Sequence, residues 1–423
     1  MSDTSSRALF FRNAAQVVTL AGPPVPRRGR DLGDLGILPQ GSVLIQGGVI
    51  LQVGSARSLQ RAATRARAES IDCRGRVILP GFVDSHTHLV FAASRVKDYE
   101  LRLRGKSYEE IAGAGGGIQS SAAGVREASA ALLARRAQCF LEQFAAHGTT
   151  TLEVKSGYGL EIAQELKLLR VIRKLQAESP LELIPTLLAL HALPADSRGR
   201  RAEYVRTVMQ RLIPTVVRAG LAEFIDCFCD DAAFSPDECR RVLRAGRELG
   251  LTPRIHAEQL SRTGGVRLGV ETDAASADHL DKVSAADVQT LARSATIATL
   301  LPGANFHLGL KSYPPARKLI DAGAALALAT DFNPGTSPTL NMQFVISLAC
   351  TQMRMAPAEA IAAATINGAC ALRRAARLGS LEAGKQADLV VMDVSDYREI
   401  PYYFAVNHCL MTVKRGRIVY CRG

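Results

Sequence analysis

Tryptophan is absent from this chain, and aromatic residues make up only 5% of its 423 residues. Proteins that bind nucleic acids by base stacking place aromatic side chains among their basic ones. The basic clusters here, such as Arg27, Arg28 and Arg30, have few aromatic neighbours. We therefore attribute the net charge of +12 to dispersed, solvated arginines that attract small anions, and we expect no nucleic-acid partner.

Long apolar runs are missing as well. No segment stays apolar over the ~20 residues that a membrane span requires, so we expect no membrane partner. Residues 1–20 do not have the pattern of a signal peptide, because Arg12 and Asn13 interrupt the apolar run. The nine cysteines are odd in number and scattered, which is typical of reduced thiols. These features favour a cytoplasmic protein.

Hydrophobic residues make up 47% of the chain, enough for a large core. Both ends of the chain contain short alternating or apolar runs separated by turn residues, which indicates β-strands. Neither end has enough strands for its own sandwich. We predict one composite β-sandwich domain, formed by residues 1–76 and 379–423 and interrupted by a second domain of residues 77–378.

The middle of the chain alternates apolar runs with segments rich in Ala, Leu, Arg and Glu. Near-continuous hydrophobicity is typical of buried parallel strands, and the intervening segments fit crossover helices. Eight such units predict a (β/α)8 TIM barrel, whose chemistry lies at the carboxyl ends of its strands. The predicted strands are 77–83, 149–154, 182–190, 222–229, 252–256, 272–277, 296–301 and 324–329.

The histidines agree with that placement, because six of the eight fall at or after the end of a predicted strand. His86 and His88 follow the first strand, His191 the third and His279 the sixth, while His256 ends the fifth. Asp331 follows the eighth strand. We interpret His307, in the loop after the seventh, as structural.

The pair His86 and His88 is the sharpest signal. In an extended chain, residues two apart point the same way. Together with His256 and Asp331 they make a nitrogen-rich set with a single carboxylate, which suits zinc or iron rather than magnesium or calcium. A metal held there lowers the pKa of bound water to about 7 and polarises a carbonyl such as that of an amide. Because no lysine ends the fourth strand, we predict one metal.

Several motifs carry a resemblance to a known family. GFVDSHTHLV, the later histidines, Asp331 and GSLEAGKQADLVVMD resemble the amidohydrolase superfamily. HTHLVFAASR (86–95), EVKSGYGLE (153–161) and ATDFNPGTSPTLNMQ (329–343) are more specific, and they resemble the imidazolonepropionase family. The resemblance implies hydrolysis of the ring amide of 4-imidazolone-5-propanoate to N-formimidoyl-L-glutamate, in histidine degradation.

The resemblance also implies site residues. The metal, one Zn²⁺ or Fe³⁺ per subunit, would be held by His86, His88, His256 and Asp331. The small-molecule substrate would contact Arg95, Tyr158, His191, Gln259, Asn333, Gly335 and Thr336, with Tyr108 a weaker candidate. A homodimer is expected on the same grounds.

The residues themselves leave alternatives open. Arg95 has the planar fork that holds a carboxylate in two contacts, or it belongs to a surface ion pair. Tyr158 lines the mouth, or it packs under its glycine-flanked loop. The turn at 333–338 offers amide donors to an anion, or it is merely tight. Lys155 has no catalytic role in this interpretation, and we expect it to be structural, perhaps ion-paired.

One position departs from a wider pattern. Deaminases of this superfamily resemble one another in a glutamate three residues after the histidine of strand five, where this chain has Gln259. An amide cannot carry a proton, although it can hold a cyclic amide by hydrogen bonds. His279 and Asp331 are therefore the predicted catalytic acid–base pair. Gln259 disfavours a purine or pyrimidine deaminase, and the complete ligand set disfavours a non-catalytic scaffold.

Overall fold

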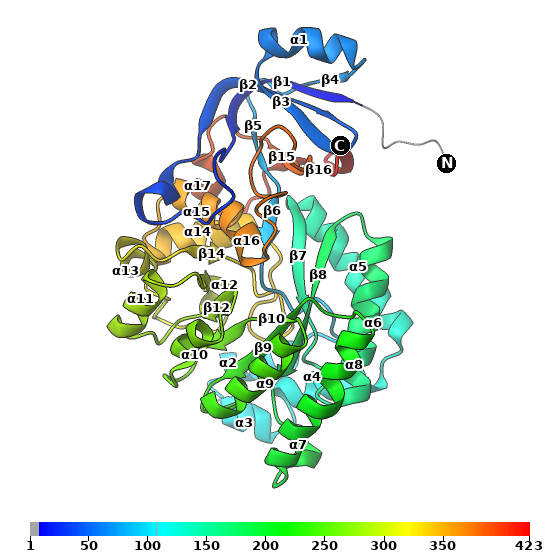
Figure 1. Cartoon of the computed structure of the whole chain (residues 1–423), viewed down its shortest axis with the longest axis vertical. Coiled ribbons are helices and arrows are strands. Elements are labelled where there is room, and N and C mark those ends of the chain that lie inside the picture. Colours follow the sequence, from blue (N-terminus) through cyan, green and yellow to red (C-terminus); the bar gives the residue numbers. More distant parts are fainter. Residues whose placement is uncertain (1–7, 107) are drawn as a thin grey trace.

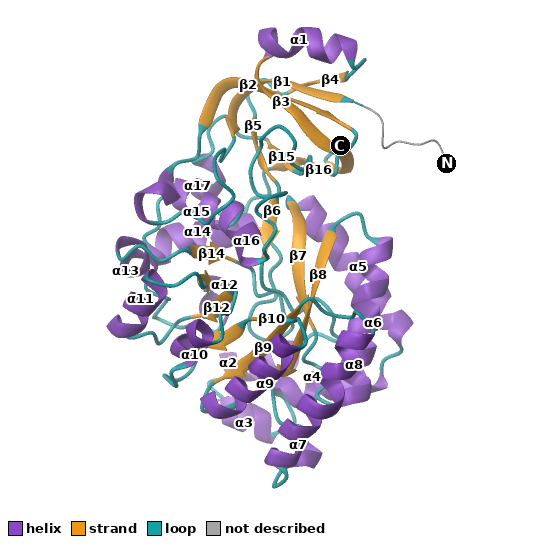
Figure 2. Ribbon diagram, viewed as in Figure 1, coloured by secondary structure: helices purple, strands orange, loops and turns teal. Residues whose placement is uncertain are grey.

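The computed structural model describes residues 8–106 and 108–423, which form two parts. A large ring of parallel strands with helices around it makes up most of the molecule (Figure 1). A smaller sheet lies at one end of this ring and contains strands from both ends of the chain, as the positions of the labels show (Figure 2). Among the described residues, no helix is long and apolar enough to cross a membrane.

The ring is a barrel of eight parallel strands, as predicted. Hydrogen bonds join neighbours in the order β14–β13–β12–β11–β9–β8–β7–β6, and β10 also pairs with β9. A parallel bridge between Thr87 and Phe332, just beyond β6 and β14, connects the two outer strands. The strands are β6 (Phe82–Asp84), β7 (Thr149–Lys155), β8 (Glu182–Leu190), β9 (Phe224–Cys229), β10 (Thr252–Pro253), β11 (Ile255–Ala257), β12 (Ser276–His279), β13 (Ile297–Leu300) and β14 (Leu326–Leu328).

Most of the helices cover the outside of the barrel (Figure 2). Several begin at side chains that satisfy free backbone N–H groups of the first turn, among them Ser129 before α5, Ser235 before α9 and Asn341 before α14. The helices are α1 (Ala56–Arg65), α2 (Val96–Leu103), α3 (Tyr108–Gly113), α4 (Gly117–Glu127), α5 (Ala130–Ala146), α6 (Ile162–Glu178), α7 (Arg201–Thr207), α8 (Ile213–Arg218), α9 (Pro236–Glu248), α10 (Gly265–Glu271), α11 (Ala285–Ala292), α12 (Pro302–His307), α13 (Ala316–Asp321), α14 (Met342–Met353), α15 (Pro357–Ala363), α16 (Ile366–Ala371) and α17 (Glu399–Tyr402).

The smaller part is one continuous, mainly antiparallel sheet, and it is built from strands of both ends of the chain, as predicted. Its order is β17–β16–β15–β5–β1–β2–β3, with β4 paired to β1. Buried side chains from both ends, such as Phe11, Val43, Leu389 and Val413, share one apolar cluster. The strands are β1 (Leu9–Val18), β2 (Ile37–Gln46), β3 (Val49–Ser55), β4 (Glu69–Asp72), β5 (Val77–Pro80), β15 (Leu389–Met392), β16 (Cys409–Lys414) and β17 (Arg417–Cys421).

Two predicted strands need correction. The run 77–83 is two strands in two sheets, because β5 pairs with β1 and β15 while β6 pairs with β7. The chain passes from one sheet to the other at Gly81, where a Cβ would lie 2.2 Å from Thr150. The sixth strand begins at Ser276 rather than Thr272, because Thr272 ends α10 and Asp273 turns the chain with a φ of 53°. His279 therefore ends its strand instead of following it.

Candidate active site

The seam that joins β6 to β14 brings the predicted ligands together. Asp331 N donates to His86 O (3.0 Å) and His88 N donates to Phe332 O (2.9 Å). Asp331 has a φ of 53°, a left-handed conformation that aspartate tolerates better than most residues. His86, His88 and Asp331 therefore meet through backbone pairing between segments that lie more than 240 residues apart in the sequence.

Four histidines and one aspartate form a buried cluster at this seam. The ligand atoms of His86, His88 and Asp331 all lie within 4.8 Å of one another, and so do those of His86, His256 and His279. His86 Nε2, His256 Nε2 and Asp331 Oδ1 are buried without a hydrogen-bond partner. Such atoms are costly to leave unsatisfied, and a cation shared among them would satisfy all three. The donor set thus fits zinc or iron, and His279 also has a ligand atom within 4.8 Å of one on His86.

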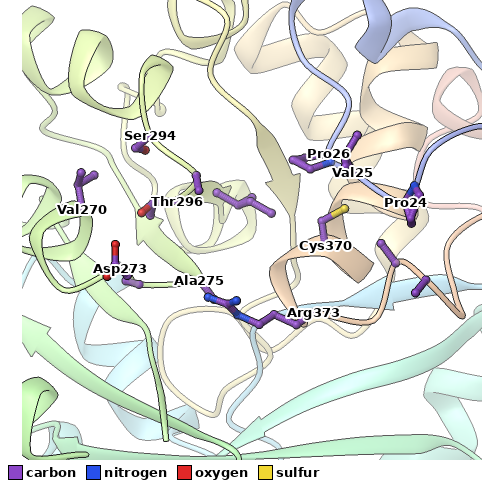
Figure 3. A pocket seen from close by; sticks show the side chains of 15 residues that line it. Pro24, Val25, Pro26, Val270, Asp273, Ala275, Ser294, Thr296, Cys370 and Arg373 are labelled. Carbon is purple, nitrogen blue, oxygen red and sulfur yellow. The ribbon is translucent and has the colours of Figure 1, made fainter. Parts of the chain in front are cut away.

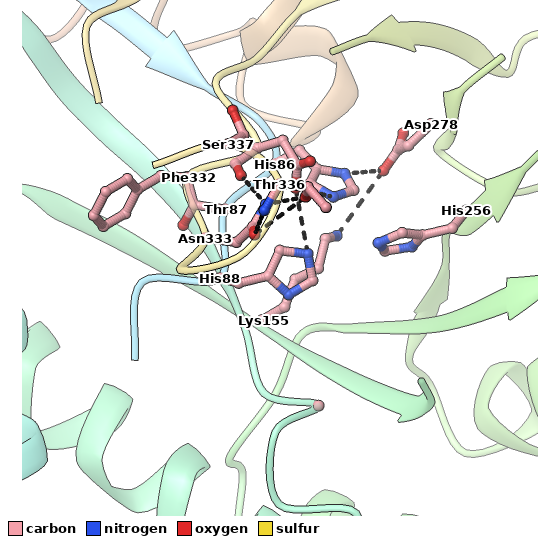
Figure 4. Close-up of polar contacts among 12 residues, drawn as sticks. His86, Thr87, His88, Lys155, His256, Asp278, Phe332, Asn333, Thr336 and Ser337 are labelled. Atoms are coloured by element: carbon pink, nitrogen blue, oxygen red, sulfur yellow. Dashed lines mark hydrogen bonds and ion pairs between the residues drawn. The ribbon is translucent and has the colours of Figure 1, made fainter. Parts of the chain in front are cut away.

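The second ring nitrogen, Nδ1, of both His86 and His256 contacts a carboxylate. His86 Nδ1 lies 2.7 Å from Asp278 Oδ2 (Figure 4), and His256 Nδ1 lies 3.1 Å from Asp226 Oδ2. A carboxylate on Nδ1 fixes the tautomer in which Nε2 is bare and able to bind a metal. Burial lowers the pKa of His86 and of His88 well below the ordinary value. Both rings are therefore neutral, as metal binding requires.

A buried lysine ties these carboxylates together. Lys155 Nζ lies 2.8 Å from Glu153 Oε1, 2.8 Å from Asp226 Oδ2 and 3.9 Å from Asp278 Oδ2. Burial lowers the pKa of Lys155, but Asp226 and Glu153 raise it more, so the lysine is charged. The expected ion pairing of Lys155 is confirmed, although its contact with the carboxylates that hold His86 and His256 was not predicted.

Arg254, the residue directly before β11, also belongs to this network. Its Nη2 donates to Ser85 O (2.6 Å) and lies 3.2 Å from Asp278 Oδ2, and its side chain is fully buried. Two cations thus face three carboxylates beneath the histidines. Glu153, Asp226, Arg254 and Asp278 were not predicted as part of the site. The one signal in the sequence is a charged residue inside an otherwise apolar strand, such as Asp226 in the run Phe224–Cys229.

The loop after β14 is bound to itself and to Arg95. Asn333 Oδ1 accepts hydrogen bonds from the backbone N–H groups of Gly335 (2.8 Å) and Thr336 (2.7 Å). These two donors are therefore used within a tight turn, and they do not point freely at an anion in this structure. A Cβ on Gly335 would lie 1.1 Å from Arg95 Nη2, so only glycine leaves room for the guanidinium. Arg95 Nε is buried without a hydrogen-bond partner.

Two predicted contact residues lie beside the metal cluster. The ring of His191 stacks on that of His88 with centroids 5.5 Å apart, and Tyr158 lies 5.3 Å from His191 and 5.7 Å from His88. His191 Nδ1 donates to Gly157 O (2.8 Å), which leaves Nε2 for another partner. Burial lowers the pKa of His191 to about 3, so the ring is neutral.

Gln259 follows β11 by two residues and is half-buried. Its neighbour Glu258 points elsewhere, because its carboxylate accepts hydrogen bonds from the backbone N–H groups of Gly264, Gly265 and Val266 at the start of α10. Glu258 thus cannot replace the missing glutamate. His307 stacks on Tyr99 rather than on the cluster. The side chain of Tyr108 lies outside the described residues.

A cleft of about 630 Å³ at the other end of the barrel is separate from this cluster (Figure 3). Its lining includes Ala275 and Thr296, which precede β12 and β13, together with Pro26 and Arg373. It therefore lies at the amino ends of the strands, the face that contributes to stability rather than to chemistry in barrels of this kind.

Known proteins resemble this chain over nearly its full length. Residues 77–419 match the model of the amidohydrolase family. The imidazolonepropionase of Geobacillus kaustophilus is 47% identical over 416 residues, 98% of each chain. That of Solibacter usitatus is 44% identical over 411 residues, 97% of this chain and 98% of the other.

Solved structures share the fold at low sequence identity. A triazine hydrolase variant superposes with a TM-score of 0.73 at 17% identity, covering 97% of this chain and 94% of its own. The guanine deaminase of E. coli gives a TM-score of 0.71 at 17% identity, covering 98% and 100%. The fold agrees with the family match, and the near-full-length relatives are more specific: the chain belongs to the amidohydrolase family and, within it, to the imidazolonepropionases.

Proposed function

We propose that this protein hydrolyses the ring amide of 4-imidazolone-5-propanoate to N-formimidoyl-L-glutamate. The observation that carries this proposal is the juxtaposition of two features at the mouth of one barrel. The bare Nε2 of His86 lies 3.6 Å from Asp331 Oδ1, and His256 has a ligand atom within 4.8 Å of one on His86. The guanidinium of Arg95 lies against Gly335 with an unpartnered donor. A metal-binding set beside a cation with an unused donor suits a cyclic amide that carries an anionic arm.

We propose that His86, His88, His256 and Asp331 hold one zinc or iron ion. When bound, such an ion polarises the ring carbonyl and makes water acidic enough to attack at neutral pH. Burial raises the pKa of Asp331 well above the ordinary value, and a nearby cation would favour its charged form again. The carboxyls and lysine beneath the cluster keep the ligand rings in place.

The chain's own residues position the substrate and move its protons. Arg95 binds the propionate, and Tyr158, His191 and Gln259 surround the ring. His279 or Asp331 takes a proton from the attacking water, whose oxygen forms the new bond to the carbonyl carbon. The ring C–N bond then breaks, and the same pair returns a proton to the leaving nitrogen, which stays attached to the product. His279 is the last residue of β12 with a φ of 80°, a strained conformation of the kind found at functional sites.

The decisive experiment is an assay with 4-imidazolone-5-propanoate that follows loss of its ring absorbance and measures ammonia. Ring opening without ammonia is the expected result. Release of ammonia from purine or pyrimidine amines at a comparable rate would instead identify a deaminase. Removal of the metal by a chelator, followed by its return, provides the control, and activity that is complete without metal would contradict the proposal.

Three further expectations belong to this proposal. The enzyme acts as a homodimer in the cytoplasm, and the two parts of the chain are two domains, divided near residues 81 and 379 because β5 pairs within the terminal sheet. Sedimentation of the purified protein tests the first expectation, with a single species of twice the chain mass as the predicted result.

A further inference from the structure

A second arginine lies against the same loop residue as Arg95. Arg102 Nη1 donates to Gly335 O at 3.0 Å, and the place of a Cβ on Gly335 is taken by Arg95 Nη2. Arg102 follows Arg95 by seven residues, which is about two turns of helix α2. The two guanidinium groups therefore come from the same side of α2 and meet at the loop after β14.

Both guanidinium groups keep an unused donor in a buried position. Arg95 Nε and Arg102 Nη2 have no hydrogen-bond partner. The nearby carboxylate of Asp98 does not supply one, since its Oδ2 lies 3.9 Å from Arg95 Nε and accepts a hydrogen bond from Gly117 N at 2.9 Å. Buried donors without partners destabilise a protein, so their presence at the mouth points to a group that arrives from outside.

The charge of Asp98 offsets only part of the cost of placing Arg102 here. The pKa of Arg102 is lowered by burial first and then by the like charge of Arg95, and Asp98 raises it by less than these two together lower it. The ring of Tyr99 lies 5.8 Å from Arg102 Cζ and stacks on His307 at 4.9 Å. Burial, helped by the charge of Arg102, lowers the pKa of His307 to about 4, so this histidine is neutral at pH 7.

We propose that Arg102 is a second specificity-determining residue, which binds the carboxylate of the substrate's arm together with Arg95. An anion between the two guanidinium groups would satisfy both unused donors and remove the repulsion between like charges. A neutral arm would leave both buried donors unused, with only the 3.9 Å contact of Asp98 facing Arg95. The site therefore selects monocarboxylate arms over neutral ones, a step that rests on the proposed function.

The alternative is that Arg102 has a purely structural role. Its hydrogen bond to Gly335 O stabilises the loop that contains Asn333 and Thr336. The two roles differ in what they discriminate. Propping the loop supports every ligand alike, whereas direct contact supports only ligands with a carboxylate. A comparison of charged and neutral ligands therefore separates them.

The experiment uses the metal-loaded enzyme and three variants. Arg102→Met removes the charge, Arg102→Lys keeps it, and Arg104→Met removes an arginine two positions away that pairs with Glu100 on the exposed face of α2. The ligands are imidazole-4-propanoate, which carries the same arm, and its neutral amide, with dissociation constants measured by calorimetry. The substrate KM is measured in parallel.

We expect Arg102→Met to raise the dissociation constant of imidazole-4-propanoate and the substrate KM about 10- to 100-fold, the range of one charge-assisted contact. Its effect on the amide should stay below about threefold on the same reasoning. Arg102→Lys should keep most of the preference for the acid, and Arg104→Met should keep all of it.

Equal weakening of acid and amide by Arg102→Met would overturn the inference in favour of loop support, and so would no change in either. If Arg102→Met does not fold, Arg102→Gln decides by the same comparison. Weaker binding of the acid with unchanged binding of the amide supports the inference, and equal weakening of both ligands, or no change in either, overturns it. Wild-type enzyme that ignores imidazolonepropanoate but shows the Arg102-dependent preference would sink the proposed function and leave this inference standing.

Discussion

The Nδ1 nitrogen of His86 lies 2.7 Å from Oδ2 of Asp278, and both side chains are fully buried. Asp278 lies one position before His279 on β12, so a single strand both orients a proposed metal ligand and supplies a proposed acid–base residue. Arg254 and Lys155 approach the same carboxylate from the barrel interior. The chemistry at the mouth thus depends on buried ion pairs beneath it.

Asp278→Asn should weaken metal binding about 10- to 100-fold, because a neutral amide holds the His86 tautomer less firmly. Competition with a chelator measures this affinity directly. Asp287→Asn is the matched control, since Asp287 is also buried but caps helix α11. Equal metal affinity in the two variants would show that Asp278 does not orient His86.

Lys155→Met should both destabilise the protein and lower its metal content. Removing one partner of a buried ion pair costs about 3–5 kcal/mol, because the other charges are left unpaired. Lys414→Met provides a comparison, since Lys414 is equally buried and lies 2.7 Å from Asp388 and 3.2 Å from Glu182, away from the histidine cluster. We expect thermal unfolding to shift in both variants, and the metal content to fall only in Lys155→Met.

Glu182 gives a pH dependence at the junction between the barrel and the terminal sheet. Burial alone would raise the pKa of Glu182, but the charges of Lys414 and Arg377 outweigh burial and lower the pKa to about 2. A carboxylate whose pKa is lowered in the folded protein stabilises the fold at every pH above about 4.5, its pKa in the unfolded chain. This stabilisation is lost as the pH falls from there toward 2. Glu182→Gln should therefore cost on the order of 3 kcal/mol at pH 7.

The difference in melting temperature between wild type and Glu182→Gln should shrink steadily as the pH is lowered from 5 to 3, within the range where that carboxylate takes up its proton. Glu178→Gln on α6 is the control, because Glu178 is exposed and its 3.7 Å contact with Lys174 is a surface pair. A difference that stays constant with pH would contradict the role of Glu182 as a paired carboxylate.

Arg95→Met should raise KM with little change in kcat, because the carboxylate contact is the same in substrate and transition state. The expected loss is about 2–4 kcal/mol for a two-contact, charge-assisted pair. Steady-state kinetics with 4-imidazolone-5-propanoate measures it. An unchanged KM would assign Arg95 to an ion pair with Asp98, its nearest carboxylate in the structure.

The barrel and the ligand positions could be predicted from the sequence because each signal is local. Buried parallel strands are apolar along their length, and the residue that follows a strand is found by counting. His86, His88, His256 and Asp331 were proposed as ligands in this way, and the structure brings all four to one end of the barrel.

The supporting charges could not be predicted, because their meaning depends on distant partners. Asp278 meets His86 across 192 residues, and Asp226 meets Lys155 across 71. Nothing near Asp226 in the sequence distinguishes a charged residue facing the barrel interior from one facing solvent. The division of 77–83 into two strands was missed for a similar reason, since both halves are equally apolar and only pairing separates them.

We expect substitutions of His279 and Gln259 to distinguish a ring-opening enzyme from a deaminase. The ring of His279 lies 5.5 Å from that of His86 and 5.2 Å from that of His256, and burial lowers its pKa well below the ordinary value. The ring of His279 is therefore neutral and lies beside the proposed metal site, which is what we expect of a base. Gln259 can only donate and accept hydrogen bonds, and Glu258 is committed to helix α10.

His279→Asn is the sharper substitution, because asparagine tolerates the φ of 80° at this position better than alanine does. It should lower kcat by ~10²-fold more than Gln259→Ala does, through loss of acid–base work, while Gln259→Ala should act mainly on KM. Metal content must be measured alongside, since His279 lies near enough to be a ligand. A near-silent His279→Asn with an inactive Gln259→Ala would show that proton transfer belongs to another residue, whereas loss of metal from His279→Asn would show that His279 helps to hold the metal.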